Sequence, residues 1–357
     1  MKTLDKINKV KDFFKNRKVA IAFSGGADST LLVHLAKQSN ADILAITFDN
    51  HVDPSGFIEY AKKRACDFQI KHEIIESDYF ETDLVANTPS RCYDCRKLMY
   101  ASIKQVAFEK DYEIIVDGNN ITDLIHDRPG ILVKYENDIS SPFIDAGLES
   151  HEIHKYLNDN EIEYSKSTTC LATRIKTNQK VTIEKINRIE YGESFIRDLT
   201  GNEIVRLRED NDTAIIEVDD LEMILDIEKI HEIEKELKNL QYNRILLDVN
   251  TYDDKSKLIE DFEIKSLQNG RLKFEKELPY TIDIKNTLKE FEKIDKIDNL
   301  GQISNIISLD AGYIKIEIED KIIRLFEKGK VVLENLNTKE EIYLYLIKTL
   351  PLIRRKL

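Results

Sequence analysis

Short apolar runs alternate with helical patterns in the first part of this chain, and this alternation constrains the fold more than any other feature. The apolar runs occupy residues 18–23, 43–48, 72–75 and 113–116, and helical patterns follow Asp28, Pro54 and Ser90. Strands separated by helices form parallel βαβ units with right-handed crossovers. We therefore expect an α/β fold built on a doubly wound parallel sheet.

Three polar turns directly follow expected strands. Residues 24–26 come after the first strand, Asp49 after the second, and residues 117–120 after the fourth. In open α/β sheets, ligands bind beyond the carboxyl ends of the strands. The three turns should therefore share one ligand-binding rim.

The segment 19–30 has the features of a phosphate-binding loop. It reads ValAlaIleAlaPheSerGlyGlyAlaAspSerThr, which is a buried strand, a glycine turn and a helix start. Gly25 and Gly26 allow backbone conformations that a Cβ would block, so successive amide hydrogens can point at one anion. The helix dipole and the hydroxyls of Ser24 and Ser29 add to this site. The Gly-x-x-x-x-Gly-Lys-Ser/Thr pattern of kinase-like loops is absent, so the segment predicts a phosphate cradle of another kind.

This loop and the neighbouring turns supply the residues that we expect to bind ATP and Mg²⁺. Asp28 can hold Mg²⁺, which prefers carboxylate and phosphate oxygens, or it can cap the helix. Asp49 follows the second strand, where proteins that this chain resembles place adenine or ribose, but an Asp that closes a strand also forms turns. The expected ATP-binding residues are Ser24, Gly25, Gly26, Ala27, Asp28, Ser29, Asp49, Gly118 and Asn120.

Three of the four cysteines indicate a metal or sulfur site. Cys92 and Cys95 lie three positions apart at the start of an expected helix. Such thiols share a helix face, and the helix N-terminus favours their thiolates. Cys170 lies at the junction of the first two expected domains, where an active-site crevice would form. Three thiolates fit a [4Fe-4S] cluster that leaves one iron free of protein ligands.

Other interpretations of the cysteines stay open. Zinc would usually recruit a fourth Cys or His, and His51, His126 and His154 are available. A pair of half-buried thiols without a metal is the simpler alternative. Cys66 stands apart from the others, and we expect it to be a small core residue.

Length and charge limit the classes of protein. A chain of 357 residues exceeds the roughly 250–300 residues of one hydrophobic core, so two or three domains are expected. No apolar run approaches the roughly 18 residues of a membrane span, and the few cysteines suit a reducing compartment, so we expect a soluble cytoplasmic protein. The formal net charge of -13 disfavours a long nucleic-acid partner.

The pattern changes after Cys170. A small α+β domain is predicted by helices at 182–199 and 221–240 and strands at 203–208, 214–218 and 244–249. The polar residues 252–277 predict a connection. Strands across 306–333 and a final helix capped by Asn337 and Glu340 predict a third, small α+β module. The expected domains are 1–168, 169–255 and 263–357.

The loop at 24–29 resembles the SerGlyGly-x-AspSer loop of the PP-loop ATP-pyrophosphatases, which hold pyrophosphate while a substrate oxygen attacks the α-phosphate. Over roughly residues 1–255, the chain also resembles the sulfur transferases that mature the nickel-pincer nucleotide cofactor of lactate racemase. The matching pieces are 24–29, 91–97, 117–120 with Asp123, 128–130, 141–143, 170–175, 205–208, 214–218 and 247–252.

This resemblance implies that ATP adenylates a carboxylate of a pyridinium dicarboxylate mononucleotide, which then becomes a thiocarboxylate. One branch of the family sacrifices the cysteine that matches Cys170. Another branch has three cysteines and a cluster, so Cys92, Cys95 and Cys170 imply the cluster branch. The expected catalytic residues are Cys170, Asp28 and Lys97. The expected partners are a small anionic nucleotide, sulfide or another sulfur donor, and further copies of the chain in a homo-oligomer.

Three arginines complete the expected substrate site. Arg206 and Arg208 alternate along a predicted strand and would point to the same side, offering forks for phosphate or carboxylate. A solvated strand face with surface ion pairs is the alternative. Arg174, within the motif at 170–175, joins this set. The rival functions are a tRNA 2-thiolation enzyme and a non-catalytic sensor of nucleotide and cluster.

Overall fold

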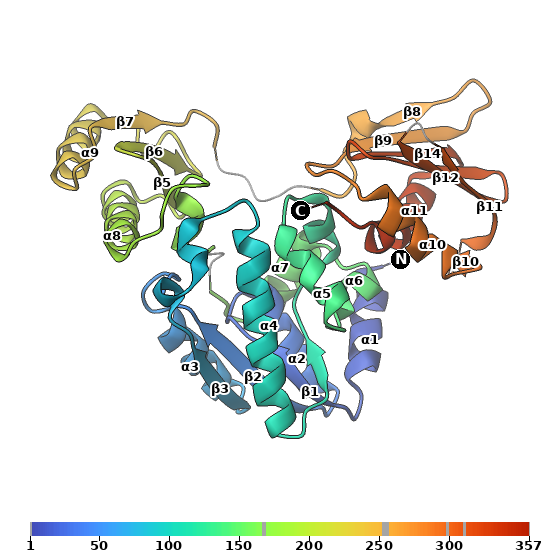
Figure 1. The fold of residues 1–357 in the computed structure, drawn as a ribbon, viewed down its shortest axis with the longest axis horizontal. Helices are drawn as coiled ribbons and strands as arrows, with labels where there is room; N and C mark the ends of the chain where they lie inside the picture. The colour runs from blue at the N-terminus through green and yellow to red at the C-terminus, as the bar shows by residue number, and fades with distance from the viewer. Residues whose placement is uncertain (1, 166–168, 252–256, 298–299, 310–311, 357) are drawn as a thin grey trace.

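A computed structural model describes residues 2–165, 169–251, 257–297, 300–309 and 312–356, and three β-sheets follow one another along this part of the chain (Figure 1). The first sheet has the parallel strand order β3-β2-β1-β4. Its strands are β1 (Lys18–Ala22), β2 (Asp42–Asp49), β3 (Lys71–Glu76) and β4 (Ile114–Val116). All four strands expected in this part of the sequence are confirmed.

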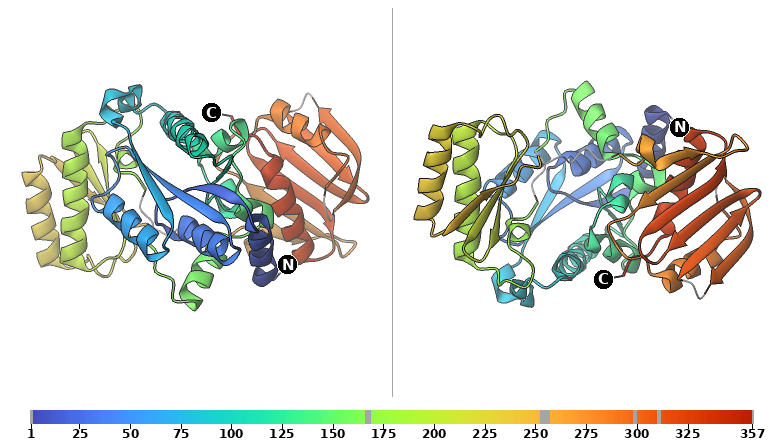
Figure 2. Two further views of the ribbon diagram at one scale, coloured as in Figure 1. Left: turned by 90° about the horizontal axis from the view of Figure 1, so that it is seen from below. Right: turned by 90° about the horizontal axis from the view of Figure 1, so that it is seen from above.

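Helices cover both faces of the first sheet (Figure 2). Val19 and Ile21 of β1 share a core with the helices of one face, whereas Ala20 belongs to the core of the other face. The first face is covered by α1 (Thr3–Phe14), α2 (Ala27–Gln38), α3 (Phe57–Asp67), α6 (Pro142–Ala146) and α7 (Ser150–Asp159). The second face is covered by α4 (Arg91–Glu109) and α5 (Leu132–Glu136). Because successive side chains of a strand point to opposite faces, this arrangement confirms the doubly wound α/β fold.

The second sheet has the order β5-β6-β7, with β5 and β6 antiparallel and β6 and β7 parallel. Its elements are α8 (Ile183–Thr200), β5 (Val205–Asp210), β6 (Thr213–Val218), α9 (Ile227–Asn239) and β7 (Arg244–Leu247). Helix α9 begins later than the predicted residue 221, because Asp226 caps it by accepting from the backbone N–H groups of Glu228 and Lys229. The predicted strand end at 249 is also later than the observed Leu247.

The third sheet has the antiparallel order β10-β11-β12-β13-β14-β9-β8. Its strands are β8 (Ile264–Ser266), β9 (Leu272–Glu277), β10 (Lys296–Ile297), β11 (Gly301–Leu309), β12 (Tyr313–Ile318), β13 (Lys321–Phe326) and β14 (Lys330–Leu336). Helices α10 (Ile284–Glu292) and α11 (Lys339–Thr349) contribute to the same core. The strands expected across 306–333 are confirmed.

Two predictions for this last part were wrong. Residues 264–266 and 272–277 of the expected connection form β8 and β9. Phe274 faces the core, while its neighbours Lys273 and Glu275 pair at 2.7 Å on the other side and give the strand a polar sequence. The start of this predicted connection, 252–256, lies outside the described residues. The cap of α11 is Thr338, whose hydroxyl accepts from the Glu341 backbone N–H at 3.1 Å, instead of Asn337.

The second and third sheets flank the first (Figure 1). We propose that the three sheets mark three domains, and the boundary expected at 168 lies outside the described residues. In the described ranges, every helix is too short or too polar to cross a membrane.

Candidate active site

The loop between β1 and α2 holds its own backbone in place, because the Ser24 N–H donates to the Ser29 hydroxyl at 3.3 Å and the Gly26 N–H to the Ser24 hydroxyl at 3.4 Å. Gly25 has φ +74°, and its carbonyl accepts from the Ser165 backbone N–H at 2.9 Å and from the Thr30 hydroxyl at 3.1 Å. Gly26 is the N-cap of α2, which begins at Ala27, and no side chain among the described residues caps this helix start. The first N–H groups of a helix lack partners within the helix, so they form an anion site.

Polar side chains gather around these amides. The hydroxyls of Ser24 and Ser29 lie 3.2 Å apart, and the Ser29 hydroxyl donates to the Gly26 carbonyl at 3.2 Å. Ser24, Asp28 and Ser29 line the same cavity. The expected phosphate-loop side chains are therefore brought together.

The turn after β4 packs directly on the phosphate loop. A Cβ added to Gly118 would lie 2.9 Å from the Cβ of Asp28, so only glycine allows this approach. Asn120 donates from Nδ2 to the Asp28 carboxylate at 3.1 Å. Asp117 fixes the base of the turn by accepting from the Tyr100 hydroxyl at 2.6 Å. Gly118 and Asn120 thus lie beside Asp28, as expected for residues of one rim.

Asp28 is a half-buried carboxylate in an acidic environment. Burial, followed by the nearby Asp123 carboxylate, raises the pKa of Asp28 to about 7. Arg128 pairs with Asp123 at 2.5 Å. Asp28 does not cap α2, because its carboxylate faces the cavity and Asn120. A hard cation shared with phosphate oxygens would relieve this repulsion, so Asp28 fits the expected Mg²⁺ role.

Two adjoining cavities meet at the phosphate loop. The first has a volume of about 400 Å³ and an apolar wall that includes Phe23, Ile46, Phe48, Met99 and Ile103. The second has a volume of about 780 Å³ and a more polar lining. Arg96 and Arg128 line both cavities, which places two guanidinium groups at their junction. Such a pair of cavities suits a nucleotide base on the apolar side and an anionic group on the polar side.

The three expected thiols line the first cavity. Cys92 and Cys95 lie in the first two turns of α4, and Cys170 immediately precedes the 3₁₀ helix η5 (Leu171–Arg174). Arg91 donates from Nη2 to the Cys92 sulfur at 3.2 Å, and Asn50 donates from Nδ2 to the Cys95 sulfur at 3.7 Å. The fold thus joins two thiols of one helix with a third from a distant segment.

Burial favours the protonated forms of the Cys95 and Cys170 thiols in the absence of a metal. Burial, followed by the Asp53 carboxylate, raises the pKa of Cys170 to about 12, and burial also raises the pKa of Cys95. In the described ranges, no group of three His, Cys, Asp or Glu side chains already surrounds a single metal-ion position. Three soft sulfur donors around a cavity larger than one ion nevertheless suit a cluster, whose binding would displace the thiol protons.

Among the described residues that line this cavity, no histidine and no fourth cysteine joins the three thiols as the zinc alternative would usually need. His126 and His154 line the second cavity, and His51 lies 3.4 Å from Asp49 at the end of β2. Cys66 is exposed, so its prediction as a core residue was wrong. Ala61 and Ala65 are the residues of α3 that face the core, and Cys66 points away from it.

Several expected site residues lie away from the cavities. Lys97 is exposed, with its ammonium 5.9 Å from the centre of the Tyr93 ring. Asp49 accepts from the His51 backbone N–H at 2.9 Å, and the next residue, Asn50, lines the first cavity instead.

The three arginines expected to bind substrate support Thr169 and the sheet instead. Arg174 pairs with Glu193 at 2.6 Å and donates to the Thr169 hydroxyl at 2.5 Å. Arg206 donates to the same hydroxyl at 3.0 Å, and Arg208 pairs with Glu217. Thr169 lines the second cavity, so Arg174 and Arg206 contact the site through this residue.

Sequence reasoning gave no role to Asp53, Tyr79 or Ser165. Asp53 and Tyr79 line the first cavity, and Ser165 lines the second. The Asp-Pro turn after β2 could have indicated Asp53. Tyr79 and Ser165 carry no local signal, because only the packing of distant segments brings them here.

Comparison with known proteins adds four observations. Residues 1–127 match the family of PP-loop domains. An uncharacterized protein of Methanocaldococcus jannaschii is 32% identical over 246 residues, covering 69% of this chain and 94% of that protein. A pyridinium-3,5-bisthiocarboxylic acid mononucleotide synthase of Lactiplantibacillus plantarum is 22% identical over 241 residues, covering 66% of this chain and 87% of that protein. A tRNA-5-methyluridine(54) 2-sulfurtransferase of Thermotoga maritima is 29% identical over 128 residues, covering 33% of this chain and 41% of that protein.

Proposed function

This chain belongs to the PP-loop family of ATP-binding proteins, and from that premise we propose that it activates a substrate carboxylate with ATP and replaces one carboxylate oxygen with sulfur. One shared cavity carries this proposal. The phosphate-loop residues Ser24 and Asp28 line the same cavity as Cys92, Cys95 and Cys170. Nucleotide binding alone needs only the phosphate-loop residues. Sulfur transfer also needs a sulfur site next to the activated carboxylate, which the cysteines can supply.

Activation requires pyrophosphate to leave. A carboxylate oxygen of the acceptor attacks the α-phosphorus of ATP, and the bond from that phosphorus to the bridging pyrophosphate oxygen breaks. The bonding electrons and the developing negative charge leave with pyrophosphate. The first N–H groups of α2 and the hydroxyls of Ser24 and Ser29 would stabilise this charge. Asp28 would hold Mg²⁺, which when bound neutralises further charge.

Sulfur transfer follows at the acyl carbon. Sulfide attacks this carbon, and AMP leaves with the electrons of the carbon–oxygen bond, so the product is a thiocarboxylate. We propose that Cys92, Cys95 and Cys170 hold a [4Fe-4S] cluster, which when bound supplies an iron without a protein ligand for exogenous sulfide. The Arg91 guanidinium beside the Cys92 sulfur offsets the negative charge of the thiolates.

We propose a pyridinium dicarboxylate mononucleotide as the acceptor. Support comes from the L. plantarum relative, whose name states a bisthiocarboxylic acid mononucleotide product. Arg96 and Arg128, at the junction of the two cavities, offer guanidinium forks for a phosphate or a carboxylate. A local positive site of this kind allows an acidic protein to accept an anionic substrate.

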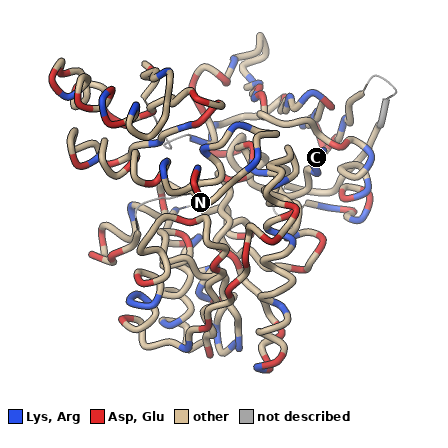
Figure 3. The backbone as a smooth tube through the Cα atoms, turned by 60° about the vertical axis from the view of Figure 1, so that its left-hand side comes forward, with Lys and Arg blue, Asp and Glu red and all other residues tan. Residues whose placement is uncertain are grey.

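Transfer RNA 2-thiolation is the second candidate, because the T. maritima relative is named for a tRNA sulfurtransferase. That match covers only 33% of this chain. Acidic and basic residues are interspersed along the chain (Figure 3), and the formal net charge is -13. Binding to a phosphate backbone usually rests on a concentrated basic surface, so these features favour the small acceptor.

The test measures pyrophosphate release and metal content of anaerobically purified protein. We expect about four irons per chain, and pyrophosphate release that depends on the pyridinium dicarboxylate mononucleotide and not on tRNA. The Cys66→Ser variant is the matched control, because Cys66 is exposed and lies away from the cavity thiols. Release stimulated only by tRNA would favour the second candidate. If neither the mononucleotide nor tRNA stimulates pyrophosphate release, both proposed enzyme functions are contradicted.

A further inference from the structure

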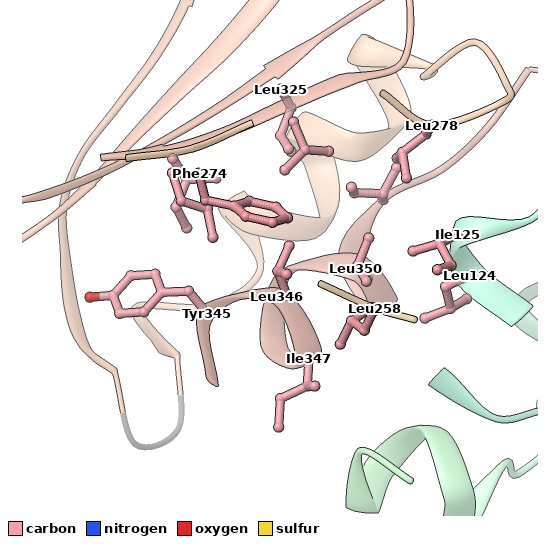
Figure 4. Close-up of a cluster of buried hydrophobic side chains, with 14 of the residues drawn as sticks. Leu124, Ile125, Leu258, Phe274, Leu278, Leu325, Tyr345, Leu346, Ile347 and Leu350 are labelled. Atoms are coloured by element: carbon pink, nitrogen blue, oxygen red, sulfur yellow. The ribbon is translucent and has the colours of Figure 1, made fainter. Parts of the chain in front are cut away.

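The C-terminal module, defined here as the described residues of 257–356, shares its hydrophobic core with a segment of the first domain. Figure 4 shows Leu124 and Ile125 beside Leu258, Leu278 and Leu350. All five side chains are at most 6% exposed. The module is therefore packed firmly on this segment and is not a separately tethered unit.

Two side chains of the module also bind the backbone of this segment. The Tyr280 hydroxyl donates to the Leu124 carbonyl at 2.7 Å, and Arg355 donates from Nη1 to the His126 carbonyl at 3.0 Å. The Arg355 guanidinium lies 3.8 Å from the centre of the Tyr280 ring, so the two side chains form one unit. Both carbonyls lie at the end of the 3₁₀ helix η3 (Ile121–Ile125), where the regular helix supplies no further donors.

The same short segment contacts the nucleotide site. Asn120 donates to the Asp28 carboxylate at 3.1 Å, and its own backbone N–H donates to the Asp123 carboxylate at 2.8 Å. Asp123 pairs with Arg128, and both residues line both cavities. The hydrogen bonds of a 3₁₀ helix have poorer geometry than those of an α-helix, so contacts on each side decide where η3 lies.

We propose that the C-terminal module braces residues 120–128, and that Tyr280 and Arg355 are positioning residues for ATP binding. Neither side chain is among those that line the two cavities. They act through the carbonyls of Leu124 and His126, which hold η3 against the phosphate loop. The family match ends at residue 127, so the brace adds to the PP-loop unit. The inference concerns ATP binding and is independent of the proposed sulfur chemistry.

The test compares full-length variants by calorimetric binding of Mg²⁺ with a non-hydrolysable ATP analogue, and by amide hydrogen exchange. Tyr280→Phe and Arg355→Met each remove a donor to the segment, and Arg355→Lys restores one. Lys356→Met is the matched control, because Lys356 is exposed and pairs with Glu327. We expect the double variant Tyr280→Phe/Arg355→Met to bind the analogue about threefold to tenfold more weakly.

Amide hydrogen exchange of individual segments distinguishes a positioning role of Tyr280 and Arg355 from a general loss of stability. Amides of 121–131 should exchange at least about fivefold faster in the double variant, while amides of β1 and α2 stay unchanged. Arg355→Lys should recover part of the affinity, and Lys356→Met should match the unmodified protein. Unchanged affinity in the double variant would overturn the proposal. An equal rise of exchange in β1 and α2 would also overturn it, because the module would then only stabilise the whole domain.

Discussion

The Nη1 atom of Arg91 lies 2.7 Å from the carbonyl oxygen of Ala172, and this hydrogen bond ties helix α4 to the segment that carries Cys170. The other terminal nitrogen of Arg91 donates to the Cys92 sulfur. One buried guanidinium therefore contacts both sources of cavity thiols. A lysine has no planar fork and could not serve both partners at once.

We predict that Arg91→Lys lowers iron incorporation at least about fivefold and leaves ATP binding within about twofold. A buried hydrogen bond to a charged group contributes about 1.5–3 kcal/mol, and its loss would let the two thiol-bearing segments separate. Iron analysis and calorimetry with Mg²⁺ and ATP test this. Arg197→Lys, on the exposed side of α8, is the control. Full iron content in Arg91→Lys would show that iron binding by the cysteines does not depend on the Arg91 hydrogen bonds.

The fate of Cys170 separates two chemistries. If it is a cluster ligand, Cys92→Ser, Cys95→Ser and Cys170→Ser should each abolish the cluster and sulfur transfer, while pyrophosphate release continues. If it is a sacrificial donor, only Cys170→Ser should abolish transfer, and the chain should lose one H₂S, about 34 Da, after a single turnover. Intact-mass measurement after turnover with added sulfide decides between them. We expect many turnovers with unchanged mass.

The ionised Asp28 carboxylate should lower the stability of the ligand-free protein, although Mg²⁺ binding requires it. Its folded pKa of about 7 is above the ordinary value of 3.8, so the folded protein favours the protonated form. Stability from this group is therefore full below about pH 4 and is lost as the pH rises through 7. Without Mg²⁺ and ATP, Asp28→Asn should be more stable than the unmodified protein above pH 7, by on the order of 2–4 kcal/mol.

The Asp28→Asn variant should at the same time bind Mg²⁺ with ATP at least about tenfold more weakly, because a hard cation loses a carboxylate ligand. Urea unfolding at pH 6 and pH 8.5 measures the first effect, and calorimetry measures the second. Equal stability of the two proteins at pH 8.5 would show that the Asp28 carboxylate is not strained by burial.

Gly118→Ala should disrupt the phosphate loop locally. The new Cβ would lie 2.9 Å from the Cβ of Asp28 and 3.2 Å from the Ser29 backbone nitrogen, so one of the two turns must move. We expect ATP affinity to fall at least about tenfold, measured by calorimetry. Gly192→Ala is the matched control, because its Cβ would meet the end of the Leu207 side chain at 2.5 Å in the second domain. If both variants lose ATP affinity equally, general destabilisation explains the effect.

The amino-acid sequence by itself determined the first sheet and its phosphate loop, because both depend on local patterns. Strand and helix periodicity along 18–116 is a property of neighbouring residues, and so is the SerGlyGly turn that needs Gly25 at a positive φ. The shared rim of the loop and the turn at 117–120 then follows from the handedness of βαβ units. These features could be predicted before any tertiary contact was known.

Tertiary packing decided what surrounds that loop. Cys170 meets Cys92 and Cys95 only because residues far apart in the chain fold against each other. Arg174 and Arg206 support Thr169 instead of lining the cavities, because buried guanidinium groups take the nearest acceptors that the fold offers. Strand β9 was hidden by its charged outer face. The role of the C-terminal module could not be predicted from the sequence either. Its hydrogen bonds to the carbonyls of residues 124 and 126 join residues more than 150 positions apart, and Tyr280 and Leu124 are separated by 156. The periodicity of a segment does not identify such partners. Any buried carbonyl or apolar side chain of the right shape could satisfy the hydrogen-bonding or packing needs of the module.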